Sequence, residues 1–329
     1  NYTIIHEIKQ DEGNLKLKKK GRSKTEEIRA RRGDELEENI YKELIKKYKK
    51  HIKIKKDSNR IEKTKEAIKK GYDLIHKAYF ENEGWHGEID FLIKVEGKKT
   101  NLGNFGYEVY DSKLSSFEKT DHIIQLNIYN EWLEKLQGSN QKTPDHTWLF
   151  LGNKEDKKKY KVLDFQLYFK KNVENYIDFL NSDKKQKQTY PERCQFCNLC
   201  DWIDHCEKKW LEDDHLNQIK LIRRDQIRKI YQHGKKNLTD FLKLKETEKI
   251  KDLNPAVLKT HLSQAKLLKK YQETGEPQIK LLPLKEGRGF NKLPKDSSHD
   301  LYFDIEGLDK ILNPEENSQS KSGLEYLFG

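Results

Sequence analysis

Two acids and a lysine carry the clearest chemistry in this sequence. Asp111 and Lys113 lie two positions apart in a segment with the alternation of a strand, so their side chains leave the same face. Asp90 lies between apolar neighbours in the preceding strand-like segment, and antiparallel pairing would bring its carboxylate near Asp111. Two carboxylates are the minimum cradle for Mg²⁺ or Mn²⁺. A lysine beside that ion can position a water or stabilise charge on a phosphate, so these residues predict a metal-assisted hydrolytic site.

Three residues on expected helices complete this candidate site. Glu37 lies beside the apolar stripe of the first helix, where a lone charge is costly unless it meets a cation or a donor. Gln125 and Tyr129 are four positions apart on a later helix, so they share a face and can hydrogen-bond to a phosphate or to metal ligands. The competing interpretation of Glu37 is a solvated charged face, because Glu35 and Glu38 are close neighbours.

Four cysteines form a second candidate centre, with the spacing Cys194-x2-Cys197-x2-Cys200-x5-Cys206. Thiolates this close can surround tetrahedral Zn²⁺ or an iron–sulfur cluster, and the spacing does not choose between them. Chemically inert free cysteines are the alternative. Four cysteines in 329 residues are too few for a disulfide scaffold, so we expect metal chemistry in a reducing compartment.

The elements that would position these residues form an α/β arrangement. Apolar residues recurring every three or four positions predict helices at 23–50, 60–80, 118–137 and 166–181. Apolar alternation and short apolar runs predict strands at 87–95, 105–114, 146–151 and 160–165. Ser23 and Glu26 form a capping box at the first helix, Gly97 ends the first strand, and a polar loop joins the first two strands as in a hairpin. This order predicts an α/β fold.

The ordered set of site residues resembles the RecB-type branch of the PD-(D/E)XK nucleases. The resemblance is carried by Gly33-x3-Glu37, Asp90 in GEIDFLIKV, Asp111-x-Lys113 in YEVYDSKL and Gln125-x3-Tyr129 in QLNIY. Each motif alone occurs by chance on solvated surfaces, so the order and the spacing carry the weight. The resemblance covers about residues 1–215 and implies a restriction-endonuclease-like core, a mixed central sheet flanked by helices.

The same resemblance implies a role for each of these residues. The acids Glu37, Asp90 and Asp111 would bind Mg²⁺ or Mn²⁺. Lys113 would assist hydrolysis as the catalytic lysine. Gln125 and Tyr129 would contact substrate or organise the site.

The cysteine segment resembles the iron–sulfur staple of AddB and of the CRISPR-adaptation nucleases. That likeness rests on Cys197, Cys200 and Cys206 just after the nuclease core, and it implies a 4Fe–4S cluster that ties the end of the domain to its beginning, with Zn²⁺ as the alternative. In those proteins the fourth thiolate comes from upstream of the first helix. Here Cys194 substitutes for it, or the ligand precedes Asn1. Without metal we expect a loose, protease-sensitive tail.

The C-terminal half is expected to be a helical region followed by a truncated domain. Segment 206–272 is almost wholly helical by pattern, with Asp213, Asp214 and His215 opening one helix and Gly234 breaking the next. It resembles the region that follows the nuclease in RecB-like proteins with an RNase-H-like domain. The expected parts are a nuclease core at 1–190, the cysteine staple at 191–215, a helical region at 216–275, a linker at 276–299 and the start of an RNase-H-like domain at 300–329.

The strand expected at 301–306 carries a second pair of acids. Asp304 and Glu306 lie two apart on one face, and the segment resembles the first motif of DEDD-type 3′–5′ exonucleases. Residues 324–328 are its expected hairpin partner. Such a site needs two further carboxylates from later strands, so we expect this truncated second site to be inert.

Composition limits the partners of the chain. With 66 Lys and Arg against 55 Asp and Glu, the formal net charge is +11, which suits a polyanion such as DNA. No apolar stretch is long enough for a membrane span and no signal peptide is evident, so we expect a cytoplasmic protein. The sequence contains no methionine, so Asn1 is treated as an artificial or processed start with further sequence upstream.

The sequence therefore predicts a metal-dependent DNA nuclease that acts on single strands or DNA ends. Resemblance implies a role in repair, recombination or defence, with a helicase, fused or separate, as a partner. The alternatives are a non-catalytic DNA-binding module and a zinc-stabilised interaction protein in which the acids are surface charge.

Overall fold

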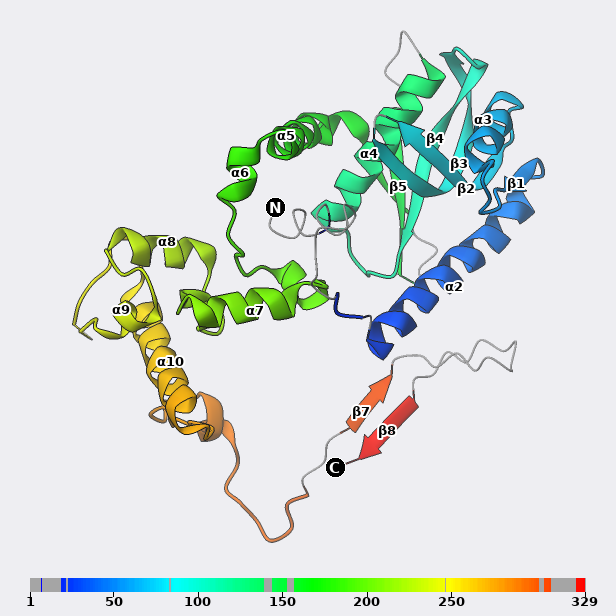
Figure 1. Cartoon of the computed structure of the whole chain (residues 1–329). Helices are drawn as coiled ribbons and strands as arrows, with labels where there is room; N and C mark the ends of the chain where they lie inside the picture. The colour runs from blue at the N-terminus through cyan, green and yellow to red at the C-terminus, as the bar shows by residue number, and fades with distance from the viewer. Residues whose placement is uncertain are drawn as a thin grey trace. The chain divides into compact units, whose positions relative to one another are not determined.

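The computed structural model places the chain in two compact units (Figure 1). The described residues are 7, 19–21, 23–82, 84–138, 144–152, 157–245, 247–301, 305–308 and 324–328. The first unit comprises Asn1–Lys243 and Ile250–Leu253, and the second comprises Leu244–Lys249 and Asn254–Gly329. The candidate site and the cysteines both belong to the first unit.

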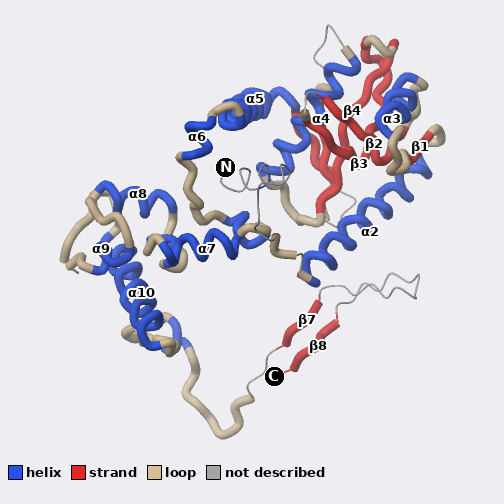
Figure 2. The backbone as a smooth tube through the Cα atoms, viewed as in Figure 1, coloured by secondary structure: helices blue, strands red, loops and turns tan. Residues whose placement is uncertain are grey.

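The first unit carries, among its described residues, a six-stranded sheet with the order β1-β2-β3-β4-β5-β6. The strands are β1 (His51–Lys53), β2 (Leu74–Asn82), β3 (Trp85–Thr100), β4 (Gly103–Lys113), β5 (His146–Leu151) and β6 (Lys157–Lys161). β1 pairs parallel with β2 and β4 with β5, whereas the other neighbours are antiparallel, so the sheet is mixed. Helices flank the sheet (Figure 2), and the prediction of an α/β fold is confirmed.

Apolar side chains on successive strand positions build a core on each face of the sheet. On one face, Phe91 and Tyr110 pack with apolar residues of α2 (Lys24–Lys47), such as Leu44. On the other face, Leu92 and Val109 pack with α3 (Arg60–Lys69) and α4 (Thr120–Gln137). The expected capping box of the first helix is present at its N-terminus. Each helix buries one apolar stripe, which fixes the helices that carry site residues against the strands that carry the rest.

The pairing of β2 with β3 is interrupted at one place. His76 pairs with Phe91 and Ala78 with Ile89, but Lys77 and Asp90 between them form no pair. Lys77 has φ 60°, a left-handed conformation that is uncommon away from glycine. Each strand thus has one extra residue at the same point. The alternation of side chains between the two faces of the sheet reverses there, so Ile89 packs in the same core as Leu92, whereas Phe91 packs in the core on the opposite face.

Several expected boundaries were wrong. The helix expected at 60–80 ends at Lys69, because Gly71 takes φ 64° and the chain turns into β2, so its apolar residues from 74 onward belong to a strand. Gly97 does not end β3, which continues to Thr100 through a register irregularity. The strand expected at 160–165 ends at Lys161, and α5 (Val162–Leu180) begins directly after it. The short helix α6 (Asp183–Lys187) follows α5.

The segment expected to be almost wholly helical is divided by turns. Its elements are α7 (Ile203–Glu212), η2 (Leu216–Gln218), α8 (Arg224–Gln232), α9 (Leu238–Leu242) and, in the second unit, α10 (Pro255–Thr274). As expected, Gly234 follows the end of α8, with φ 84°. The segment 276–299 is exposed where its burial is described, apart from the half-buried Gln278, and it has one short 3₁₀ turn, η3 (Gly289–Lys292).

The expected C-terminal hairpin is present. β7 (Ile305–Leu308) pairs antiparallel with β8 (Leu324–Phe328). Asp304 lies outside the described residues, and Glu306 lies in β7, where it pairs with Leu327. Within the described part of the chain, no helix combines the length and the apolar character that crossing a membrane requires.

Candidate active site

The two central acids face each other across neighbouring strands. Phe91 pairs with Tyr110, so the next position of the same register sets Asp90 on β3 against Asp111 on β4. Ser112 holds the Asp90 carboxylate from the adjacent position. Its backbone N–H donates to Asp90 Oδ2 at 2.8 Å and its hydroxyl donates to the same oxygen at 2.6 Å. Antiparallel pairing therefore brings these carboxylates together as the sequence predicts.

These carboxylates disfavour one another's charge. Burial, with the negative charges of Asp111 and Glu37, raises the pKa of Asp90 well above its usual value. Burial also raises the pKa of Asp111, which is 2% exposed, and the nearby Lys113 offsets that only in part. Two carboxylates in this state are stabilised by a cation that neutralises both.

Lys113 is the cation nearest to this pair. Its Nζ lies 2.5 Å from Asp111 Oδ2, since both residues project from the same face of β4. It also donates to Gln125 Oε1 on α4 at 2.9 Å. Gln125 Nε2 in turn donates to the Tyr129 hydroxyl at 2.5 Å, one helical turn along. The structure thus joins all four residues in one chain of contacts.

Glu37 lies at the same site but holds other partners. It is 6% exposed on α2, accepts a hydrogen bond from His76 Nε2 at 2.7 Å, and is also bonded by Lys77. Burial alone would raise the pKa of Glu37, yet these two donors outweigh it and lower the pKa. Glu37 is therefore a buried, ionised carboxylate, whereas Glu38 beside it is on the surface and paired with Lys53.

Sequence reasoning missed His76 and Lys77. The His76 ring is stacked between Tyr41, with ring centroids 4.2 Å apart, and Phe91, at 5.1 Å. Lys77 contacts Glu37 and also lies 3.0 Å from Glu88. Both residues fall in the segment that apolar periodicity assigned to a helix, so their spacing gave no signal of a strand beside the acids.

Gly87, the first residue of the GEIDFLIKV segment, is another residue of the site, to which sequence reasoning gave no role. A Cβ at this position would lie 2.8 Å from the Phe80 ring and 3.2 Å from Tyr129 Cε1. The absent side chain lets β3 pass close under α4. Gly87 therefore helps to set the height of Tyr129 above the strands.

Two of these acids have the chemistry of metal ligands. Asp90 and Asp111 offer two facing carboxylates, a donor set that suits Mg²⁺ or Mn²⁺. Within the described ranges, no group of three or more His, Cys, Asp or Glu side chains surrounds a common point as a metal site would. Glu37 is held by His76 and Lys77, so it would have to exchange these partners to become a third ligand.

The four cysteines lie in one short turn and in the helix that follows it. Cys194 precedes the 3₁₀ turn η1 (Gln195–Leu199), and its Sγ lies 3.9 Å from Cys197 Sγ. Tetrahedral Zn–S bonds of about 2.3 Å give S···S separations of about 3.8 Å, so these two thiols are close enough to share one ion. Cys200 and Cys206 are buried, and no disulfide joins any of the four. Burial and the neighbouring thiolates raise the pKa of Cys206 to about 12.

This cysteine segment contacts the beginning of the described chain. Trp202 Nε1 donates to Glu7 Oε1 at 2.7 Å, and Lys20 N donates to Asp201 O at 2.9 Å. Lys19 lies 5.6 Å from the centre of the Trp202 ring. Residues about 190 positions apart in the chain are thus joined here, as a staple between the two ends of a domain requires.

Comparison with known proteins adds no family. No protein-family model matches the chain, and a search of curated proteins finds no match. The facing acids, the lysine beside them and the cysteine turn are therefore the features that bear on function.

Proposed function

We propose that this protein is a Mg²⁺- or Mn²⁺-dependent nuclease that hydrolyses phosphodiester bonds in DNA. One observation carries the proposal. Asp90 and Asp111 lie opposite each other on paired strands, and Lys113 Nζ is 2.5 Å from Asp111 Oδ2. Two carboxylates with an adjacent ammonium suit chemistry in which negative charge grows on a phosphate.

Asp90 and Asp111 would hold the divalent ion, which supplies Lewis acidity and lowers the pKa of a bound water. Lys113 has three N–H donors; its ammonium is paired with the Asp111 carboxylate and donates to Gln125. A further N–H can donate to a phosphate oxygen or orient the attacking water. Tyr129, through Gln125, fixes the direction of the ammonium.

The substrate class follows from charge and from the resemblance described above. A net charge of +11 favours a polyanion, and the RecB-like order of motifs favours single-stranded DNA or DNA ends, in repair, recombination or defence. RNA is a weaker candidate substrate, and the assay below tests it alongside DNA.

The cysteine turn is proposed to hold an iron–sulfur cluster, with Zn²⁺ as the alternative. Cys194, Cys197, Cys200 and Cys206 would be the ligands. The 3.9 Å separation of two of the thiols also suits a single Zn²⁺. Protein purified without oxygen is expected to be brown and to contain iron; a colourless protein containing zinc would support the alternative.

The nuclease proposal is tested by cleavage of labelled single-stranded DNA and RNA with and without Mg²⁺ or Mn²⁺. DNA cleavage should require the metal. Lys113→Ala should lower the rate about 100- to 1,000-fold, as loss of one transition-state donor does elsewhere, with the melting temperature little changed. The matched control is Lys158→Ala, which removes an exposed lysine that pairs with Glu118.

Two results would count against this function. Lys113→Ala with full activity would remove the proposed role of the ammonium. Salt-sensitive DNA binding without any metal-dependent cleavage would instead support the alternative of a non-catalytic DNA-binding module.

A further inference from the structure

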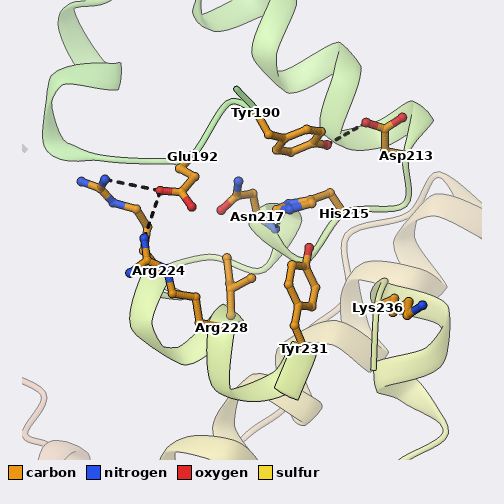
Figure 3. A pocket seen from close by; sticks show the side chains of 10 residues that line it. Tyr190, Glu192, Asp213, His215, Asn217, Arg224, Arg228, Tyr231 and Lys236 are labelled. Atoms are coloured by element: carbon orange, nitrogen blue, oxygen red, sulfur yellow. Dashed lines mark hydrogen bonds and ion pairs between the residues drawn. The ribbon is translucent and has the colours of Figure 1, made fainter. Parts of the chain in front are cut away.

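A cavity of about 560 Å³ lies in the first unit (Figure 3). Its lining residues come later in the chain than the facing acids. It is lined by the segment that precedes the cysteines, by the turn after α7 and by one face of α8. The size falls in the range of small-ligand sites. Neither the proposed hydrolysis nor the cysteine turn uses these side chains.

One part of the cavity is aromatic. The His215 ring lies against Tyr190, with centroids 4.8 Å apart, and meets Tyr231 in a T-shaped contact at 6.0 Å. Tyr231 also lines the cavity, so its ring is within reach of a ligand there. Tyr190 is fixed through its hydroxyl, which donates to Asp213 Oδ2 at 2.8 Å, and Asp213 is also paired with Lys209.

A second part is an unused hydrogen-bond acceptor. Asn217 is 2% exposed, and its Nδ2 donates to Pro191 O at 3.2 Å. This hydrogen bond decides the orientation of the amide and so identifies its other terminal atom as the oxygen, Oδ1. Oδ1 is buried and makes no hydrogen bond within the described part of the chain. Asn217 N donates to His215 Nδ1 at 3.0 Å, so the neutral ring carries its proton on Nε2. A buried acceptor without a partner is costly unless a ligand or water donates to it.

A third part is cationic. Arg224 and Arg228 lie one turn apart on α8 and share a single carboxylate, Glu192, at 3.4 and 3.9 Å. Lys236 adds a third positive charge to the lining. Since one carboxylate cannot neutralise both guanidinium groups, this side of the cavity favours an anion, and guanidinium groups match phosphate geometry well.

We propose that this cavity binds one unstacked nucleotide of single-stranded DNA, with the base against Tyr231, a base N–H donated to Asn217 Oδ1, and the phosphate held by Arg224 and Arg228. An aromatic face beside paired cations is the combination by which proteins hold single strands. The choice of DNA as the ligand rests on the proposed function. The geometry of the cavity stands independently of it.

The test measures binding without cleavage. The full chain, with its cysteine turn as purified, is titrated with fluorescein-labelled oligodeoxyadenylate in buffer without added divalent metal, and binding is followed by anisotropy. Tyr231→Ala should weaken binding about tenfold or more, because the stacking surface is lost. Arg228→Ala removes a side chain that is 68% exposed, so it should keep the fold and weaken binding by a similar factor. The matched control, Arg223→Ala, removes the arginine before α8 that pairs with Asp225 and does not line the cavity; it should change binding less than about twofold.

Competition then identifies the ligand. Deoxyadenosine monophosphate should compete better than either deoxyadenosine or inorganic phosphate, because only the nucleotide reaches the aromatic and the cationic sides together. Equal competition by phosphate alone, or unchanged binding in both Tyr231→Ala and Arg228→Ala, would overturn the proposal. Because no divalent metal is added, either result is separate from the outcome of the cleavage assay with Lys113→Ala.

Discussion

The facing acids and the cysteine turn are built in opposite ways. Asp90, Asp111 and Glu37 come from three elements that are held by a sheet with a core on each face, so their positions depend on long-range packing. The four cysteines lie within one turn and the helix after it, and only Cys200 and Cys206 are buried. We infer that the acid site keeps its geometry without metal, whereas the cysteine turn depends on metal for its order.

The largest expected effect is on the cysteine turn. Structural zinc sites contribute about 10–16 kcal/mol of binding free energy to small folds. Removal of the metal, or Cys200→Ser, should therefore expose residues 190–212 to protease while the sheet stays protected, as measured by limited proteolysis and mass spectrometry. Cys194→Ser, at the exposed cysteine, should have a smaller effect. Equal protection of this segment with and without metal would contradict the comparison.

A smaller effect is expected at Glu37. Glu37→Gln removes the carboxylate that His76 and Lys77 share, and the loss of buried charged hydrogen bonds costs about 1–3 kcal/mol of folding free energy. The matched control is Glu38→Gln, which breaks only a surface pair with Lys53 and should cost less than about 1 kcal/mol. Urea unfolding measures both. Equal stability of the two variants would show that Glu37 does not hold the helix to the sheet.

The smallest expected effect is a pH-dependent change at Asp90. Its pKa is raised in the folded state, so the metal-free protein loses stability as pH rises from the unfolded pKa through the folded pKa. Asp90→Asn should therefore melt higher than the wild type in EDTA, by a margin that is larger at pH 8 than at pH 5.

Added Mg²⁺ should stabilise the wild type and leave Asp90→Asn unchanged. The control is Asp57→Asn, at an exposed carboxylate that pairs with Lys63 and whose pKa is lowered rather than raised. If the difference in melting temperature between the wild type and Asp90→Asn did not change with pH, the facing acids would not repel each other.

The sequence predicted the strand pair and its acids because the signals are local and repeated. Alternation located β3 and β4, and the spacing of Asp111 and Lys113 placed both on one face. Gln125 and Tyr129 were placed together by the helical repeat, which α4 follows. The α/β class followed from the order of these elements, whereas the mixed sheet was what the family resemblance implied.

The remainder depends on contacts that periodicity does not encode. The apolar residues of β2 recur at intervals that also fit a helix, so His76 and Lys77 were assigned to the wrong element. The partners of Glu37 were therefore hidden, although its burial beside the apolar stripe was anticipated. The cavity beside α8 is lined by a segment, a turn and one helix face that lie apart in the chain, and no spacing rule joins Tyr190 to Tyr231.

The unpaired positions Lys77 and Asp90 constrain how this sheet can change in length. Deleting one of them would move every side chain beyond the deletion to the opposite face of the sheet. Deleting both would restore an unbroken ladder and a regular alternation, but would remove the carboxylate opposite Asp111 and a cation that binds Glu37. A deletion or insertion in one strand at this point must therefore be matched by one in the other strand. Deleting both residues restores the regular sheet, but it also removes the Asp90 carboxylate.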